Sequence, residues 1–421
     1  MNDDSRRIVF LGTHGQRNIG DELLLETFLT QLGDQHHYIV NSYDPDFTRS
    51  QLQGRFDVDV IDTARDRRRL LRELLRCDLL CFGGGSIIKE LYASTGRNAY
   101  STMLMILAIV TFTRRIARRP IAMLNVGVGP IRSPRGLRIA RMILSQVDEL
   151  TVRDALSVAT CRSVGIEPRL ATDAVFSADA EWLLGANDPR RPASGGSDGA
   201  DGSDESTTRS STPASPRTPV RVALNLNYDI ENADNWEPFL SQLGLVLERV
   251  HAAHPLELHA LPMQKGFKQH DDVEVLEGFA ARVPSLRFIP HDLAAHLDAA
   301  RVIESCDLLI SERLHAIVIA SIIGRPSFVL AYDVKVRELA TTLELTPWSV
   351  DINEPFDVTA VSDRIIGVID QRVVLGAQVA QRSAELREDA RANFARARQW
   401  VARTRRRSRP AGAVARTEPD E

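Results

Sequence analysis

The sequence has few cysteines, no long hydrophobic run and little net charge. Four cysteines occur among 421 residues, and none belongs to a CxxC pair or a zinc-ligand spacing. We therefore expect neither a disulfide framework nor a structural metal, a pattern typical of a reducing compartment. The longest apolar run, residues 103–112, is too short to span a bilayer. The net charge of −4 provides no global basic field that would hold nucleic acid.

Targeting signals and the common phosphate-binding motifs are absent as well. Residues 1–7 are charged and lead directly into an apolar segment, so we expect no signal peptide and a cytoplasmic protein. The glycine-bearing loop of residues 12–22 contains neither GxGxxG nor a GK(S/T) ending. Arg114 and Arg115 follow the apolar run, which we interpret as a buried helix. Peripheral contact with the inner face of the membrane is the alternative interpretation of these arginines.

Short apolar segments alternate with helical patterns through the first 186 residues. This alternation predicts an α/β domain with a parallel, doubly wound sheet. Residues 187–219 consist mostly of Ser, Gly, Asp, Thr, Pro and Arg, and this composition predicts a disordered linker. The α/β pattern restarts at residue 220 and predicts a second domain over residues 220–375. Residues 376–421 are predicted as a long C-terminal helix and a basic tail.

The stretch of residues 311–316 joins a predicted buried strand to a predicted helix. In an open α/β sheet this carboxyl edge is where ligands bind, and a helix N-terminus there favours an anion. Arg313 adds a fork of donors for a carboxylate or phosphate, and His315 adds a group that exchanges a proton near neutral pH. The alternative is that Arg313 pairs with a core carboxylate and that His315 only packs. Lys335 follows the next predicted strand and is either a further ligand of the anion or a solvated surface lysine.

The loop of residues 12–22 carries candidate ligands at the start of the first predicted helix. Gly15 allows the backbone to approach a ligand closely. Asn18 and Asp21 can bind a sugar hydroxyl. The alternative is helix-start chemistry, in which Asn18 caps the helix and Asp21 complements the helix dipole.

Two further predicted strand ends in the first domain carry candidate ligands. Gly84 and Gly85 belong to a Gly-Gly-Gly turn, whose backbone amides can cradle an anion or a ring. A plain tight turn is the alternative. Arg153 closes a later strand, where it is either an anion ligand or a structural partner of Asp154.

Four stretches together resemble the polysaccharide pyruvyl transferase family. They are Gly-x-x-Gly-x-x-Asn-x-Gly-Asp-Glu at residues 12–22, the glycines at 83–85, Gly-Val-Gly-Pro at 127–130 followed by Val-Arg-Asp at 152–154, and Arg-Leu-His at 313–315 followed by Tyr-Asp-x-Lys at 332–335. The resemblance covers residues 8–345. It implies two Rossmann-like domains that face each other across a cleft, similar to the GT-B architecture of glycosyltransferases.

The resemblance also implies an activity, which is transfer of a pyruvyl group from phosphoenolpyruvate to sugar hydroxyls. The acceptor would be a polysaccharide or its lipid-linked precursor, and the product a pyruvate ketal. Arg313, Lys335 and Arg153 would then bind the donor anion, His315 would act as acid or base, and Asp21 would orient or deprotonate the acceptor. This chemistry requires neither a metal nor a cofactor.

Two alternative functions remain open at the level of sequence. Gln16 and Arg17 stand where the family resemblance leads us to expect small or aromatic residues, which leaves the acceptor undefined. A nucleotide-sugar glycosyltransferase would have the same architecture and the same anion-binding edge, since a fold does not fix its chemistry. A non-catalytic binding or scaffold protein that retains the cleft is the third interpretation. None of the three has a nucleic-acid partner.

Overall fold

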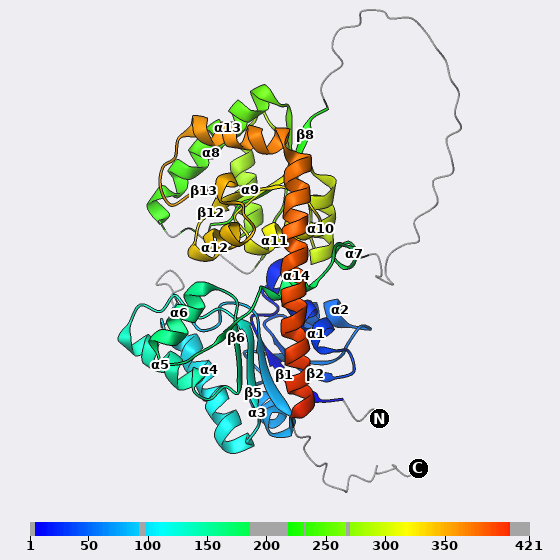
Figure 1. Ribbon diagram of the computed structural model, residues 1–421, viewed down its shortest axis with the longest axis vertical. Coiled ribbons are helices and arrows are strands. Elements are labelled where there is room, and N and C mark those ends of the chain that lie inside the picture. Colours follow the sequence, from blue (N-terminus) through cyan, green and yellow to red (C-terminus); the bar gives the residue numbers. More distant parts are fainter. Residues whose placement is uncertain are drawn as a thin grey trace, which may run out of the picture. The chain divides into compact units, whose positions relative to one another are not determined.

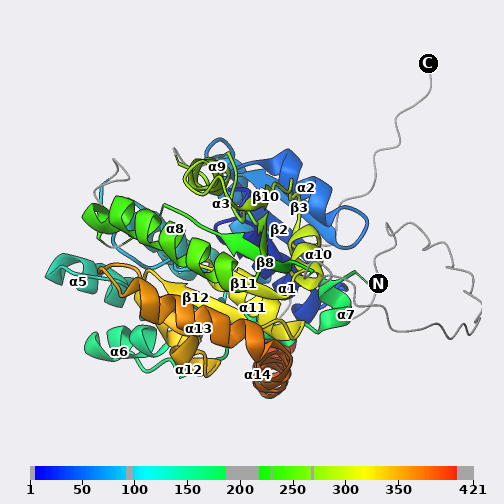
Figure 2. The same ribbon diagram turned by 90° about the horizontal axis from the view of Figure 1, so that it is seen from above.

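The computed structural model describes residues 5–91, 98–185, 218–228, 230, 232–266 and 270–404. The predicted linker of residues 187–219 therefore lies outside the described residues, apart from its last two positions. The chain divides into two compact units (Figures 1 and 2). Unit 1 contains residues up to 15, residues 28–171 and residues from 393 onward. Unit 2 contains residues 16–27 and 172–392.

Unit 1 is built on seven parallel strands. Their bounds are β1 (Arg7–Leu11), β2 (His37–Ser42), β3 (Asp57–Asp62), β4 (Leu79–Gly83), β5 (Ile121–Val126), β6 (Glu149–Val152) and β7 (Arg169–Leu170). They pair in the order β3-β2-β1-β4-β5-β6-β7. The direction of winding reverses between β1 and β4, and the carboxyl ends at such a reversal are the usual ligand position in doubly wound sheets.

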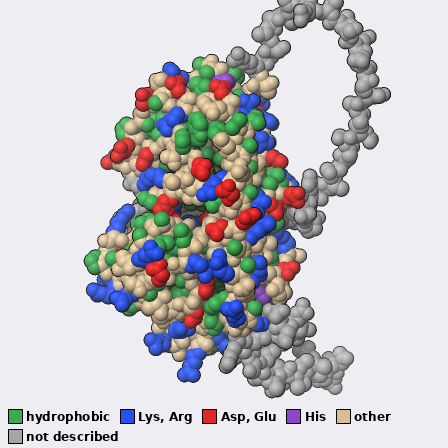
Figure 3. Space-filling view, in the orientation of Figure 1, with side chains coloured by type: hydrophobic (Ala, Val, Ile, Leu, Met, Phe, Trp, Pro, Cys, Tyr) green, Lys and Arg blue, Asp and Glu red, His purple; other side chains and the backbone are tan. Residues whose placement is uncertain are grey.

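The helices of unit 1 follow from the same winding. Their bounds are α2 (Pro45–Leu52), α3 (Arg67–Arg76), α4 (Ser101–Phe112) with the π-helical turn η2 (Thr113–Ala117), α5 (Pro134–Leu144), α6 (Ala155–Ser163) and the last turn of α1 (Ile19–Leu32). Right-handed crossovers place α3, α4, α5 and α6 on one face of the sheet. Their inward side chains, among them Leu74, Ile106 and Ile143, join the sheet in one hydrophobic cluster. The opposite sides of α3, α4 and α5 carry exposed residues (Figure 3).

Unit 2 repeats this design with six parallel strands. Their bounds are β8 (Val220–Asn225), β9 (Leu256–Ala260), β10 (Arg287–Ile289), β11 (Leu308–Ser311), β12 (Ser327–Ala331) and β13 (Ser349–Asp351), and their order is β10-β9-β8-β11-β12-β13. The winding reverses between β8 and β11. The helices of this unit include η3 (Ala174–Ser177), α7 (Ala180–Leu183), α8 (Trp236–Ala253), α9 (Asp272–Ala280), α10 (His296–Ser305), α11 (Leu314–Ile322), α12 (Val334–Thr342) and α13 (Val358–Asp370).

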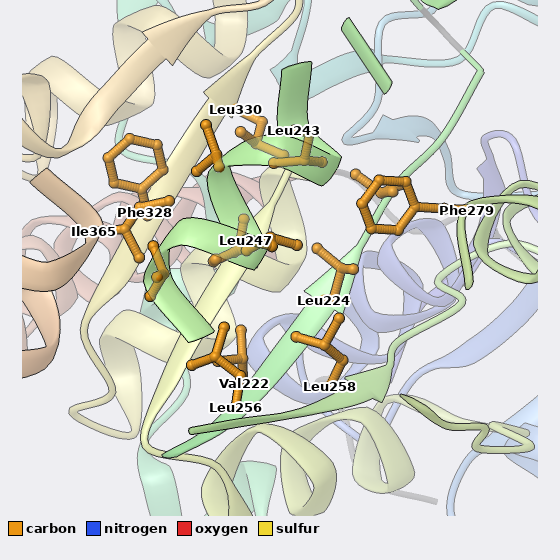
Figure 4. Close-up of a cluster of buried hydrophobic side chains, with 14 of the residues drawn as sticks. Val222, Leu224, Leu243, Leu247, Leu256, Leu258, Phe279, Phe328, Leu330 and Ile365 are labelled. Carbon is orange, nitrogen blue, oxygen red and sulfur yellow. The ribbon is translucent and has the colours of Figure 1, made fainter. Parts of the chain in front are cut away.

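The core of unit 2 lies between its sheet and the pair α8 and α13, which run side by side (Figures 1 and 2). Leu243 and Leu247 of α8 point towards Leu224 of β8 and Phe328 of β12 in a fully buried cluster (Figure 4). A fully buried leucine or phenylalanine contributes about 1.5–3 kcal/mol relative to an exposed one. The cluster therefore holds β8 and β11, and with them their carboxyl ends, in a fixed register.

The two Rossmann-like domains and the long C-terminal helix that the sequence predicts are confirmed. The helix is α14 (Arg372–Arg403), and the contacts assign residues 372–392 to unit 2 and residues 393–403 to unit 1. Phe394 packs edge-on against Phe28, with 5.3 Å between ring centroids, which explains the assignment to unit 1.

The unit boundaries differ from the predicted division into residues 1–186 and 220–375. Residues 16–27 belong to unit 2 because the amide of Ile19 donates a hydrogen bond to the carbonyl of Met263 at 2.9 Å. Residues 172–185 also belong to unit 2, where Arg391 donates to the carbonyl of Ser177 at 3.0 Å. Sequence periodicity identifies strands and helices but carries no information about these long-range contacts.

Candidate active site

The carboxyl ends of β8 and β11 in unit 2 are joined by a buried amide. Asn225 ends β8, and its Oδ1 accepts hydrogen bonds from the backbone amide of Arg313 and the hydroxyl of Ser311, both at 3.1 Å. Its Nδ2 donates to the carbonyl of Leu261 at 2.9 Å and to Asp272 Oδ2 at 3.1 Å. A buried amide with partners on both of its ends fixes its neighbours. The backbone that carries Arg313 is therefore held rigidly against β8.

Arg313 forms a buried ion pair with Asp272. The guanidinium Nη2 lies 2.5 Å from Asp272 Oδ1, and Nε lies 3.2 Å from Oδ2, so the contact is bidentate. Nη2 also donates to Gln264 Oε1 at 3.2 Å. Asp272 is only 1% exposed and accepts a further hydrogen bond from the amide of Met263. The core carboxylate that the sequence left as an alternative partner of Arg313 is thus Asp272.

His315 lies in the first turn of α11, between a glycine backbone and a carboxylate. A Cβ atom added to Gly20 would lie 2.1 Å from His315 Nδ1, so the ring occupies the space that a side chain at position 20 would take. On the other edge of the ring, Nε2 lies 3.9 Å from Asp173 Oδ2. Oδ1 of Asp173 accepts a hydrogen bond from the amide of Val175, which fixes that carboxylate. His315 therefore lies beside an anchored anion at the carboxyl edge of β11.

The start of α1 joins this edge within unit 2. Asn18 Oδ1 accepts a hydrogen bond from the amide of Gly20 at 3.0 Å, so Asn18 caps the helix as the sequence alternative predicts. The backbone of Asn18 also pairs with that of Gln264. Asp21 follows in the first turn and is half-buried. The structure thus brings Asn18 and the backbone of Gly20 to the surroundings of Arg313 and His315.

Lys335 lies at the same carboxyl edge, one strand further along. It is in the first turn of α12, which follows β12, the neighbour of β11 in the sheet. Asp333 begins that helix, and its side chain accepts from the amide of Val336 at 2.9 Å. The positive end of α12 is thus already occupied by the carboxylate of Asp333, and Lys335 is the cationic side chain of its first turn.

The remaining predicted ligands belong to the edge of unit 1. Gly84 and Gly85 have φ values of 63° and 69°, a region that favours glycine. The amide of Gly84 donates to the carbonyl of Leu124 at 3.0 Å, so the backbone of this turn pairs with β5. Arg153 Nη2 lies 3.5 Å from the hydroxyl of Ser86 in the same turn, whereas Asp154 caps α6 through the amide of Ser157.

Gly15 and His14 show that packing shapes the loop after β1. Gly15 has a φ of 75°, and a Cβ atom there would lie 2.0 Å from the hydroxyl of Ser42. His14 stacks on Phe10 with 5.9 Å between ring centroids, and neither of its ring nitrogens has a hydrogen-bond partner among the described residues. Burial lowers the pKa of His14 to about 3, so its ring is neutral at physiological pH. No sequence pattern points to this role of His14.

Three site residues were not identified from the sequence as ligands or partners, namely Asp173, Gln264 and Asp272. Asp271 and Asp272 stand at the start of α9, and Asp271 caps this helix through the amides of Val273 and Glu274. Asp272 turns inward instead, and its partner is 41 residues away in the sequence. Among the described residues, no group of three or more His, Cys, Asp or Glu side chains is arranged to hold a metal.

The fold of two Rossmann-like units is shared with solved sugar-processing enzymes. A glycosyltransferase from Rickettsia africae matches with a TM-score of 0.55 and 10% identity over 96% of this chain and 100% of its own. UDP-GlcNAc 2-epimerase from Neisseria meningitidis, solved with UDP-GlcNAc, matches with a TM-score of 0.51 and 10% identity over 94% and 99% of the two chains. The corresponding epimerase from Methanocaldococcus jannaschii has a TM-score of 0.51 and 10% identity over 90% and 98%. No curated protein matches the sequence significantly.

The two Rossmann-like units and the long C-terminal helix define a GT-B-like fold. The family model for polysaccharide pyruvyl transferases matches residues 18–334, which include Asn18, Asp21, Arg313 and His315. The chain belongs to the polysaccharide pyruvyl transferase family, and it is a transferase. Among the residues that the structure describes, no helix is both long and apolar enough to cross a membrane.

Proposed function

We propose that the protein transfers the pyruvyl group of phosphoenolpyruvate to two hydroxyls of a sugar and forms a pyruvate ketal. The observation that carries the proposal is the position of His315, whose ring lies against Gly20 and 3.9 Å from the anchored carboxylate of Asp173. The same strand-to-helix junction carries Arg313. Family membership supports transfer to a sugar or polysaccharide acceptor.

Donor binding is assigned to the carboxyl edge of unit 2. Phosphoenolpyruvate carries a carboxylate and a phosphate, which favour arginine, lysine and helix N-termini. Asp272 balances the charge of Arg313. Lys335 and the N-terminus of α11 lie at the same edge and are the further candidate contacts of the donor anion. Arg313 then contributes directional N–H groups in an orientation that Asp272 fixes. Arg153 in unit 1 is retained as a further candidate anion ligand.

The reaction requires one proton on carbon and the loss of two protons from the acceptor. Protonation of the methylene carbon makes the central carbon electrophilic, and a sugar hydroxyl attacks it. The bond between this carbon and the phosphate oxygen breaks, inorganic phosphate leaves, and a second hydroxyl closes the ketal ring. One hydroxyl proton replaces the proton given to carbon, and the other leaves with phosphate.

His315 is the proposed acid and base in this sequence of steps. An imidazole can donate the proton to the methylene carbon and accept one from the attacking hydroxyl. The carboxylate of Asp173, 3.9 Å from Nε2, would stabilise the imidazolium electrostatically. Asn18 and Asp21 are proposed to orient the acceptor hydroxyls.

The acceptor is proposed to be a polysaccharide unit or its lipid-linked precursor. Either acceptor is consistent with a cytoplasmic protein, and the lipid-linked one would place the enzyme at the inner face of the membrane. No cofactor takes part in the proposed steps.

Calorimetric titration with phosphoenolpyruvate tests the donor assignment. Phosphoenolpyruvate is expected to bind the wild-type protein and to bind Arg313→Lys more weakly, because lysine cannot reproduce the forked contact with Asp272. The matched control is Arg337→Lys, on the same helix as Lys335 but paired with Asp351 at 2.8 Å. Equal affinity of wild type and Arg313→Lys would contradict the role of Arg313.

The second candidate is a nucleotide-sugar glycosyltransferase, which the shared fold with the Rickettsia africae glycosyltransferase favours. The same titration with a panel of nucleotide sugars distinguishes the two functions. Binding of a nucleotide sugar without binding of phosphoenolpyruvate would replace pyruvyl transfer by glycosyl transfer. Ligand binding without turnover of any donor would favour the scaffold interpretation.

A further inference from the structure

Unit 1 carries a strongly basic surface in a chain whose net charge is −4. Residues 65–76 contain six arginines and two acidic residues, and residues 98–147 contain eight arginines, no lysine and no acidic residue. One of the two acids, Glu73, is buried and is hydrogen-bonded to Arg7 at 2.6 Å. These two segments form α3, α4, η2 and α5, so sequence positions about 40 residues apart contribute to one layer of helices.

The arginines lie mainly on the outer side of that layer, where Figure 3 shows basic side chains over this part of unit 1. Arg72, Arg76 and Arg115 are exposed, and among the described residues none of them has a carboxylate partner. Their positive charge is therefore not balanced within the protein. Helices that connect parallel strands end near the amino edge of the sheet, which is where α3 and η2 meet. This cluster thus lies away from the carboxyl edge that carries the unit 1 ligand candidates.

Large apolar side chains are exposed between these arginines. Six of the thirteen exposed large hydrophobic residues of the described chain belong to these helices, and Ile116, at 63%, is the most exposed of the six. The others are Leu71, Leu75, Leu104, Met105 and Met142. The apolar run at residues 103–112 does form a helix as predicted, but Leu104 and Met105 face outward, whereas Met103 and Ile106 are buried. A helix that packed only against the sheet would not need these outward apolar residues.

We propose that this basic and apolar surface, formed by the outer sides of α3, α4, η2 and α5, docks onto an anionic lipid bilayer. Arginine side chains attract anionic headgroups, while leucine, isoleucine and methionine side chains enter the boundary between headgroups and acyl chains. The long arginine stems can cover apolar surface while their charged ends stay in the headgroup region. Peripheral docking of this kind needs no membrane-spanning helix.

Nucleic acid is the other polyanion that such a surface could bind, and the side-chain types argue against it. Proteins that bind single strands stack bases on aromatic side chains set among their basic residues. The six exposed apolar residues of this surface are leucine, isoleucine and methionine, without an aromatic ring. The docking surface does not depend on the proposed pyruvyl transfer. Only one use of this surface, bringing the enzyme to a lipid-linked acceptor, rests on that proposed function.

Flotation of the full chain with vesicles tests the proposal. We expect binding to vesicles made of equal parts phosphatidylcholine and phosphatidylglycerol, little binding to phosphatidylcholine alone, and weaker binding as salt is raised. Each arginine near an anionic surface contributes roughly fivefold in partitioning, so Arg72→Gln/Arg115→Gln should weaken binding by roughly 20-fold. The control Arg249→Gln/Arg301→Gln, on the exposed sides of α8 and α10, should bind like the wild type.

The apolar part of the surface has its own pair of variants. Leu75→Ser/Ile116→Ser should weaken binding to the mixed vesicles at a salt concentration where the charged contribution is screened. Leu245→Ser/Val373→Ser, exposed residues of unit 2, is the matched control. Equal thermal unfolding of all four variants would show that folding is intact.

Three outcomes would overturn the proposal. The first is no binding of the wild type to the mixed vesicles at low salt. The second is an equal loss of binding in the control variants. The third is tighter binding of a single-stranded oligonucleotide than of vesicles, lost in Arg72→Gln/Arg115→Gln, which would assign the surface to nucleic acid. Turnover of a water-soluble acceptor is not expected to change in these variants, so failure of docking and failure of pyruvyl transfer are measured separately.

Discussion

The carboxyl edges of the two sheets have the same topology but opposite chemical character. In unit 2 the edge contains a buried ion pair between Arg313 and Asp272, and the carboxylate of Asp173 beside His315. In unit 1 the corresponding strand ends carry a glycine turn, and the histidine of the loop after β1, His14, is buried and stacks on Phe10. The ion pair and the histidine beside a carboxylate thus belong to the unit 2 edge. At the unit 1 edge, backbone and packing shape the glycine turn and the loop after β1, and Arg153 lies beside that turn.

The two edges stabilise their buried polar groups in different ways. A buried charge is tolerated when it is paired and hydrogen-bonded, which Gln264 and Asp272 achieve for Arg313. A buried imidazole without a hydrogen-bond partner is tolerated when it stays neutral, as His14 does. We therefore expect substitution of His315 in unit 2 to change turnover, whereas substitution of His14 in unit 1 changes stability.

The largest expected effect comes from the histidine of unit 2. His315→Ala should lower kcat by about 10²–10⁴-fold with donor binding largely retained, because the residue is proposed to move protons rather than to hold the donor. The matched variant His14→Gln should leave kcat close to that of the wild type. Initial rates of phosphate release in the presence of acceptor measure both. A similar loss in both variants would remove the functional difference between the two edges.

The next effect concerns the buried ion pair. Asp272→Asn leaves the guanidinium of Arg313 buried without its carboxylate, and breaking such a pair costs about 3–5 kcal/mol in the free energy of unfolding. Urea unfolding followed by circular dichroism measures the change. The control in unit 1 is Arg162→Gln, which removes a fully exposed ion pair with Glu167 and should not shift the unfolding midpoint detectably. Equal shifts of the unfolding midpoint in the two variants would show that the buried pair in unit 2 contributes no more to stability than the exposed pair in unit 1.

The two edges can also be compared by adding a single methyl group beside each histidine, at one glycine of each edge. Gly20→Ala would place its Cβ 2.1 Å from His315 Nδ1, and Gly12→Ala would place its Cβ 2.5 Å from His14 Nε2. A displacement of about 1 Å in a catalytic group can cost on the order of 10²-fold, so Gly20→Ala should lower kcat by that factor. Gly12→Ala should lower the melting temperature while kcat changes little.

Gly278→Ala controls for the substitution itself, because nothing lies within 4 Å of the added Cβ in α9. It should raise stability slightly and leave kcat unchanged. If Gly12→Ala reduces kcat as strongly as Gly20→Ala does, the loop after β1 has a catalytic role.

Sequence reasoning recovered the parts of the molecule that local patterns determine. Alternating strands and helices predicted both sheets, and the strand-to-helix position of Arg313 and His315 placed them at the carboxyl edge of β11. These features depend on residues close together in the chain. The family resemblance, carried by short motifs at four places, is confirmed by the match over residues 18–334.

The partners of these residues could not be predicted, because they come from distant segments. Asp272 is 41 residues from Arg313, and Asp173 is more than 140 residues from His315. An aspartate at the start of a helix has the same local pattern whether it caps that helix, as Asp271 does, or turns inward, as Asp272 does. The packing of β8 against β11 determines which aspartate caps the helix and which one turns inward. The periodicity of the sequence carries no information about that packing.

The smallest expected effect is the pH dependence that His14 imposes on unit 1. Burial lowers the pKa of His14 to about 3, compared with 6.5 for an unperturbed histidine, so the unfolded state takes up a proton between these values and the folded state does not. Above pH 6.5 the folded state carries no penalty from this group, and stability is lost progressively as the pH falls from 6.5 towards 3. At pH 5 the loss amounts to about 2 kcal/mol. His14→Gln removes the titration, so the difference in unfolding free energy between pH 7 and pH 5, measured in urea, should shrink by that amount. An unchanged difference would mean that the imidazole of His14 reaches solvent or a hydrogen-bond partner in the folded protein. His14 would then no longer be the buried, neutral histidine with which His315 is compared.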